Sequence, residues 1–175
     1  MSVTSEGNRI SISGEFTSED SMRCFATMHN MTNGKGYQDI ELDFGSCTRA
    51  YSPEMMALCA RSLDYWKAGV DVELVLPGDG AMARLFRNTN WAHLIDFRDH
   101  DASRFRGFTH APAIRFKDGA EQARAVDRTL DILLAAIAHF DRDELRYIEW
   151  ALNEITDNVI NHSKSSIGGI VQVTN

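Results

Sequence analysis

The residues Tyr147-Ile148-Glu149-Trp150-Ala151-Leu152-Asn153-Glu154-Ile155-Thr156-Asp157-Asn158-Val159-Ile160-Asn161-His162-Ser163 decide how the C-terminal part of the chain folds. Apolar residues recur here every three or four positions, which predicts a single amphipathic helix. Its expected buried stripe consists of Leu145, Ile148, Leu152, Ile155 and Val159. Glu154, Asn158 and His162, four positions apart, form a polar strip about 100° around the helix from that stripe. We expect this strip at the rim of a core, where a cleft would form.

The composition narrows the classes of protein to consider. The 175 residues carry a net charge of −7, and 43% of them are hydrophobic. That length suits one large domain or two small ones. The acidic balance argues against nucleic acid as a partner, and we expect no signal peptide and no membrane span. Cys24, Cys47 and Cys59 fit neither a disulfide framework nor a metal knuckle, so a reducing cytoplasm is the expected location.

Residues 8–97 alternate between strand and helix patterns. We expect strands at 8–13, 40–44 and 70–76, and helices from Thr17 to about Met31, from Ser52 to Gly69, and around Met82 to Asn88. Residues 45–51 are expected to form a loop. Ser52 is the expected N-cap of the second helix, with Pro53 at the first helical position. Such alternation predicts parallel strands joined by crossover helices, and hence a small α/β sheet.

The C-terminal part begins after a polar, basic segment, residues 101–112, which we interpret as a linker. A short strand at 113–116 precedes a helix that Asp118 and Glu121 cap. Its expected buried side consists of Ala123, Val126, Leu130, Leu133, Leu134 and Ile137. Asp141 and Glu144 repeat the capping pattern at the start of the Tyr147–Ser163 helix, and a strand at 170–174 follows Gly168-Gly169.

The polar strip contains the residue types that a hydrated magnesium ion and an activated water require. An asparagine oxygen can bind Mg²⁺, which takes few protein ligands and keeps several waters. A glutamate one turn earlier can orient or deprotonate an attacking water or hydroxyl. Glu154 and Asn158 have this spacing. A solvated helix face explains the same spacing without any ligand.

Residues 154–162, Glu-Ile-Thr-Asp-Asn-Val-Ile-Asn-His, resemble the N-box of the GHKL superfamily of ATPases, and most of all that of the anti-sigma-factor serine kinases. The resemblance implies that Asn158 coordinates Mg²⁺ on the phosphates of ATP and that Glu154 is the general base. It also implies that Asn161 and His162 flank the nucleotide pocket. The flanking order of helix, N-box helix, polar turn and strand is similar to the first half of that fold.

Residues 8–97 resemble a STAS domain, the fold of anti-sigma-factor antagonists. The resemblance rests on Ile40-Glu41-Leu42-Asp43-Phe44, the loop before Ser52, and Gly69-Val70-Asp71-Val72-Glu73-Leu74. It implies a phosphoacceptor at the start of the second helix, where Ser52 stands. The family has Asp-Ser-Ser-Gly there, whereas this chain has Tyr51-Ser52-Pro53-Glu54. A plain helix N-cap therefore also explains Ser52.

The combined expectation is an α/β protein with a STAS-like small sheet domain at 1–100, the linker, and a helix–helix–strand fragment of a GHKL ATPase sandwich at 113–175. The family's Asp-x-Gly-x-Gly motif does not follow the N-box, so we expect this chain alone to be inactive and to bind ATP weakly or not at all. The whole protein would be a bacterial signalling ATPase or serine kinase. The alternative is a non-catalytic protein that acts as a partner switch or scaffold. A regulatory protein partner or a homodimer is compatible with both functions. An Asp-x-Gly-x-Gly soon after Asn175 would favour the first.

Overall fold

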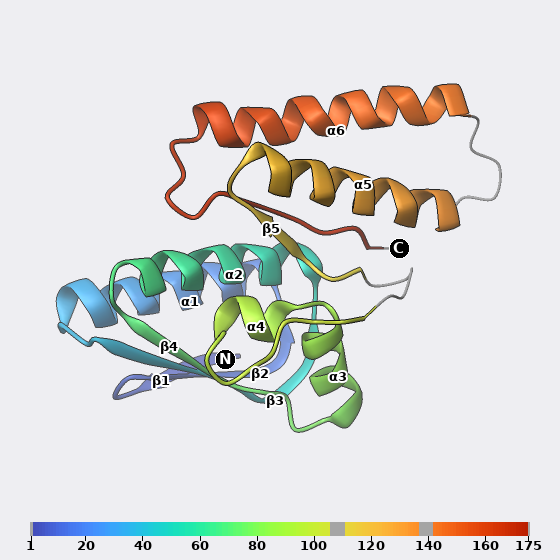
Figure 1. Cartoon of the computed structure of the whole chain (residues 1–175). Coiled ribbons are helices and arrows are strands. Elements are labelled where there is room, and N and C mark those ends of the chain that lie inside the picture. The colour runs from blue at the N-terminus through green and yellow to red at the C-terminus, as the bar shows by residue number, and fades with distance from the viewer. Residues whose placement is uncertain (1, 106–110, 137–141, 175) are drawn as a thin grey trace. The chain divides into compact units, whose positions relative to one another are not determined.

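The computed structural model describes residues 2–105, 111–136 and 142–174. The chain divides into two compact units, Met1–Arg104 and Phe105–Asn175 (Figure 1), and each is described by itself. The division falls within the segment 101–112 interpreted as a linker, of which residues 106–110 lie outside the described residues. Both units combine helices with strands, so the predicted α/β class is confirmed.

The first unit is built on a four-stranded sheet in the order β1-β2-β3-β4. Strands β2, β3 and β4 run parallel, and β1 pairs antiparallel with β2. Helices α1, α2 and α4 lie over the same face of this sheet (Figure 1). The elements are β1 (Val3–Glu6), β2 (Arg9–Phe16), α1 (Ser18–His29), a π-helical turn (Asn30–Gly34), β3 (Asp39–Ala50), α2 (Ser52–Lys67), β4 (Asp71–Val75), α3 (Gly80–Asn88) and α4 (Trp91–Ile95).

Alternation along the strands separates the core of the first unit from its solvated sheet face. Ile40, Leu42 and Phe44 are fully buried, whereas the acidic residues between them face the other side. Four aromatic rings form a chain of edge-to-face contacts in this core. The centroids are 5.4 Å apart for Phe16 and Phe44, 5.2 Å for Phe44 and Phe86, and 5.5 Å for Phe86 and Trp91. These contacts join β2, β3, α3 and α4 into one core.

Two side chains cover the outer edge of β4. Asp96 is buried, and its Oδ2 accepts a hydrogen bond of 3.2 Å from the Leu74 backbone N–H. The Nε2 atom of His100 lies 3.4 Å from the Leu74 carbonyl oxygen. Because both backbone groups of Leu74 are occupied, this part of the strand cannot pair with another chain.

Tertiary pairing corrects the predicted loop at 45–51. Strand β3 continues to Ala50 because it pairs with the end of β2, with Ser13 beside Ser46 and Phe16 beside Ala50. Strand β1 was also absent from the sequence prediction. Its four residues acquire their conformation from pairing with β2 rather than from an apolar run of their own.

The start of α2 differs from the prediction as well. Tyr51, with extended backbone angles, is the N-cap, and it makes no side-chain capping bond. Ser52 is the first residue of the helix rather than its cap. The prediction was wrong because Ser-Pro at a helix start suits both registers, and the pairing of Phe16 with Ala50 decides between them.

The second unit is a two-stranded antiparallel sheet with two helices. Strand β5 (Ile114–Phe116) pairs with β6 (Gly169–Val171), and α5 (Gly119–Ala136) packs against α6 (Arg142–His162). Asp118 Oδ1 accepts from the Glu121 N–H at 2.9 Å, while Glu121 Oε2 accepts from the Lys117 N–H at 2.8 Å. The predicted helix start is therefore confirmed. No helix among the residues described is long and apolar enough to cross a bilayer.

The buried side of α5 is turned relative to the prediction. It consists of Gln122, Ala125, Val126, Thr129 and Ile132. Ala123 and Leu134, which we expected in the core, are exposed, and Leu130 is half-buried. The predicted positions Ile137 and Asp141 lie outside the described residues. The helix has apolar residues around most of its circumference, so the period alone does not fix its rotation.

Gly168 and Gly169 leave no room for a side chain. A Cβ on Gly169 would lie 2.2 Å from Cζ of the buried Phe116 ring. A Cβ on Gly168 would lie 2.2 Å from the Phe116 carbonyl oxygen, and Gly168 has a φ of +79°, which side chains rarely allow. The two glycines therefore fix the approach of β6 to β5.

Gly169→Ala should destabilise the second unit by roughly 1–3 kcal/mol, because either Phe116 or the strand must move. Hydrogen exchange of the α5 and α6 amides would measure the loss. Gly119→Ala is the matched control, since its Cβ meets nothing within 4 Å. It should leave exchange unchanged or slow it slightly. Equal acceleration by both substitutions would contradict the packing.

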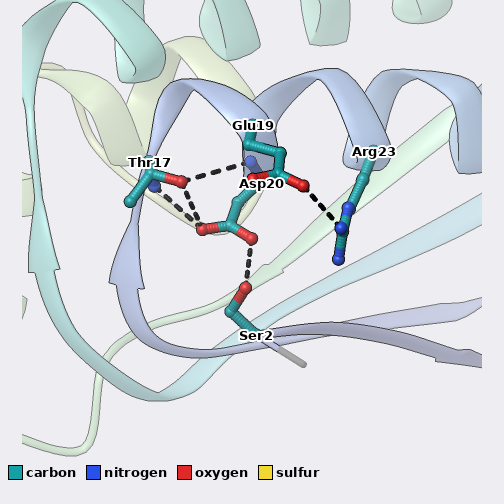
Figure 2. A network of polar contacts seen from close by, with 5 residues as sticks. All are labelled: Ser2, Thr17, Glu19, Asp20 and Arg23. Carbon is teal, nitrogen blue, oxygen red and sulfur yellow. Dashed lines mark hydrogen bonds and ion pairs between the residues drawn. The ribbon is translucent and has the colours of Figure 1, made fainter.

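A polar network joins the N-terminal segment to the start of α1 (Figure 2). The Thr17 N–H and hydroxyl donate to Asp20 Oδ2 at 3.1 and 2.7 Å, the Asp20 N–H donates to Thr17 Oγ1 at 3.4 Å, and the Ser2 hydroxyl donates to Asp20 Oδ1. Burial raises the pKa of Asp20, but the hydrogen bonds from Ser2 and Thr17 outweigh it and lower the pKa below its usual value.

Asp20→Asn should lower the free energy of unfolding of the first unit by about 1 kcal/mol at neutral pH. Since the folded-state pKa is depressed, the stabilisation is complete above the unfolded pKa and is lost as pH falls through the folded value. The difference between wild type and variant should therefore shrink below about pH 4. Urea denaturation across pH would measure it. The control is Glu19→Gln, whose exposed ion pair with Arg23 at 2.5 Å should contribute little at any pH.

Candidate functional site

The rotation of α6 about its axis is set by a polar contact with α5. Gln122, which is 6% exposed, donates from Nε2 to Thr156 Oγ1 at 2.8 Å and to Asp157 Oδ1 at 2.9 Å. The Thr156 hydroxyl in turn donates to the Leu152 carbonyl oxygen at 2.7 Å. Thr156 is buried, so its side of the helix faces α5.

The predicted polar strip lies on the opposite side of α6. Glu154 and Asn158 are each two residues from Thr156, which places them about 200° around the axis. Both are exposed, as are Asn161 and His162. The expected position at the rim of a core is therefore wrong. The apolar stripe is turned as well, because Ile155 is 63% exposed while Leu152 is half-buried.

The strip residues are not engaged by the rest of the described chain. Among the residues that the structure describes, the side chains of Glu154, Asn158, Asn161 and His162 form no hydrogen bond or ion pair. Glu154 and Asn158 stand one turn apart, about 6 Å along the axis, on the same side. Their oxygens can therefore contact one ligand together without breaking any existing interaction.

The donor set fits a magnesium ion held mainly by phosphate and water. Within the described ranges, no three His, Cys, Asp or Glu side chains are grouped so that they could hold a metal ion. Mg²⁺ on a nucleotide needs only one or two protein ligands, because phosphate oxygens and waters supply the rest. Asn158 can be such a ligand, and Glu154 can act on a neighbouring water or hydroxyl.

Ser52, the candidate phosphoacceptor, lies in the first unit at the N-terminal turn of α2 and is half-buried. Positive partial charge at a helix N-terminus favours a phosphate there. The carboxylate of Glu54, which accepts from the Ser18 hydroxyl at 2.6 Å, stands two residues further on and opposes it. The described structure brings no other candidate site residue to Ser52 within its unit.

Sequence reasoning missed the residues that orient the strip, Gln122 and Thr156. A glutamine and a threonine at helix positions carry no signal of burial by themselves. It also missed Tyr147 and Trp150, which are 74% and 66% exposed on the outward side of α6. Their position outside the apolar stripe was visible in the sequence and could have marked them as surface residues.

Comparisons of the chain with family models, with curated proteins and with solved structures found no match. The STAS-like and GHKL-like interpretations therefore rest on the sequence patterns described above.

The three cysteines are free and buried, which removes them as nucleophiles in the folded state. Burial raises the pKa of the Cys24 thiol to about 12 and that of Cys47 to about 11, and it raises the pKa of Cys59 as well. Thiolate is the reactive form, so these groups are both inaccessible and protonated near neutral pH.

Ellman's reagent at pH 8 should modify none of the three thiols rapidly in the native protein and all three in denaturant. Because Cys24, Cys47 and Cys59 all belong to the first unit, the slow native rate should report opening of that unit alone. Gly169→Ala should leave this rate unchanged. One thiol that reacts immediately under native conditions would contradict its burial.

Proposed function

We propose that α6 forms one wall of a Mg²⁺–ATP site of the GHKL type. Asn158 binds the metal on the nucleotide phosphates, and Glu154 serves as the general base. Asn161 and His162 border the nucleotide. The observation that carries this proposal is the row of unengaged polar side chains at one-turn spacing, facing away from the α5 contact.

The order of Glu154 and Asn158 along α6 suits phosphoryl transfer. In such reactions the attacking oxygen, phosphorus and leaving oxygen are roughly in line, and the metal bridges the β- and γ-phosphates. A metal at Asn158 and a base at Glu154 are one turn apart, which places the attacking oxygen on the Glu154 side. Either water or a protein hydroxyl can be the attacking group, giving an ATPase or a serine kinase.

The first unit is proposed as the regulatory part, a STAS-like module of a bacterial, cytoplasmic signalling protein. Its solvated sheet face and the N-terminal turn of α2 are the surfaces through which such a module would contact a regulatory protein partner. Ser52 is the candidate for switching by phosphorylation. A purely scaffolding role, without catalysis, is the alternative, and the exposed aromatic side chains of α6 favour contact with a protein.

Titration of the isotopically labelled chain with ATP and magnesium should perturb the amide signals of residues 154–162, with weak affinity. Asn158→Ala should raise the dissociation constant about 10- to 100-fold, because a contact to a charged group contributes roughly 1.5–3 kcal/mol. The perturbations should require magnesium, since the amide oxygen acts through the metal.

Glu149→Gln is the matched control for this titration, because Glu149 is an exposed glutamate of α6 that lies away from the strip. It should leave the perturbations unchanged. Glu154→Gln should also bind nucleotide, since its proposed role is in the chemical step. Perturbations of equal size in Asn158→Ala, or confined to another region, would refute the site.

A further inference from the structure

The turn that follows α1 in the first unit contains a chemically reactive pair of residues, Asn33-Gly34. It is the only Asn-Gly in the sequence. Both residues are exposed, and they close the π-helical turn Asn30–Gly34. Asparagine is one of the residues that limit the chemical lifetime of a protein. The proposed nucleotide site lies in the other unit and uses neither residue.

The fold itself favours a glycine at position 34. A Cβ there would lie 2.5 Å from Oδ1 of Asn30, so any other residue requires the Asn30 side chain to move. Without a Cβ, the backbone nitrogen of Gly34 is also the least hindered toward the preceding side chain. The turn thereby places beside Asn33 the residue that obstructs an attack on its carboxamide least.

The carboxamide of Asn33 is held only weakly. Within the described part of the chain, its hydrogen-bond partner is the exposed ring of His29, with Nδ2 of Asn33 2.9 Å from Nδ1 of His29. No buried group fixes the side chain, so it can turn toward the backbone of Gly34.

We propose that Asn33 is a site of spontaneous deamidation, at which the chain modifies its own backbone. The backbone nitrogen of Gly34 bonds to Cγ of Asn33, and the bond between Cγ and Nδ2 breaks, so that a succinimide forms and ammonia leaves. The Gly34 nitrogen loses its proton, and the departing amide nitrogen gains one. Water then opens the succinimide at either carbonyl and leaves aspartate or isoaspartate at position 33. No oxidation or reduction takes place, and water is the only co-reactant.

The closed turn holds the reaction back, and local opening allows it. In a π-helical turn the backbone N–H groups bond to carbonyl oxygens five residues earlier. The Gly34 nitrogen must leave this arrangement before it can reach the side chain of Asn33. Helix ends open at a small fraction of the free energy of global unfolding, so the reactive conformation is accessible in the folded protein.

The product cannot keep the turn as it is. Isoaspartate adds a methylene group to the backbone between residues 33 and 34. Three backbone hydrogen bonds span this link, from the N–H groups of Lys35, Gly36 and Tyr37 to the carbonyl oxygens of Asn30, Thr32 and Met31, at 2.9, 3.1 and 3.0 Å, respectively. They cannot all survive the longer link. Deamidation should therefore loosen the end of α1 and its connection to β3.

The test is incubation of the whole chain at neutral pH and physiological temperature, followed by mass spectrometry of its peptides. Asn33 should gain the mass difference between a carboxamide and a carboxylate, and fragmentation should identify isoaspartate. Asn30 is the internal control, since it is exposed in the same turn but is followed by Met31. Asn33→Gln should abolish the gain, because its longer side chain would need a larger ring. Gly34→Ala should slow it severalfold, because the added methyl hinders the attack.

Hydrogen exchange measures the structural consequence. The amides of residues 31–37 should exchange faster in aged than in fresh wild type, whereas aged Asn33→Gln should match its fresh sample. Circular dichroism should show unchanged helix content in the fresh variants. Absence of the mass gain at Asn33, an equal gain at Asn30, or an unchanged rate in Gly34→Ala would overturn the site. Equal loosening in aged Asn33→Gln would overturn the proposed consequence.

Discussion

The buried hydrogen bonds from Gln122 to Thr156 and Asp157 decide what α6 presents to its surroundings. Leaving a buried amide unpaired costs about 1–3 kcal/mol, so this contact resists any other rotation of the helix. Packing alone would be less decisive, because Leu152 and Val159, one turn before and one turn after Thr156, are only half-buried. The polar contact thereby directs Glu154 and Asn158 away from α5, and the proposed nucleotide site follows from that orientation.

Two outward features of α6 share one border. The polar strip runs from Glu154 toward His162, and the exposed apolar side chains of Tyr147, Trp150 and Ile155 lie between residues 147 and 155. Glu154 stands where they meet, beside Trp150 in the preceding turn. Exposed apolar side chains therefore lie next to the carboxylate proposed as the base.

Helices and strands with a regular apolar period could be predicted from the sequence, whereas the pairing between strands could not. The strands around Ile40–Phe44 and at β4, and the helices α2, α5 and α6, were visible because their apolar periods are distinct. The extension of β3 to Ala50 was not, since it depends on hydrogen bonds to β2, far away in the sequence. For the candidate site, the period identified Glu154, Asn158 and His162 as one row. It did not show which way the row faces, because Leu152 and Ile155 fit the same helical stripe and only the Gln122 contact distinguishes them.

The outward orientation of the strip can be measured without altering the chain, from the NMR signals of the asparagine and glutamine side-chain amides in the whole protein. A soluble gadolinium chelate broadens the signals of groups that solvent reaches. The orientation described here predicts strong broadening for Asn158 and Asn161, and little for Gln122, whose amide is buried against Thr156. Protection of the Asn158 amide together with broadening of Gln122 would show that α6 is turned the other way, and it would contradict the account of the site.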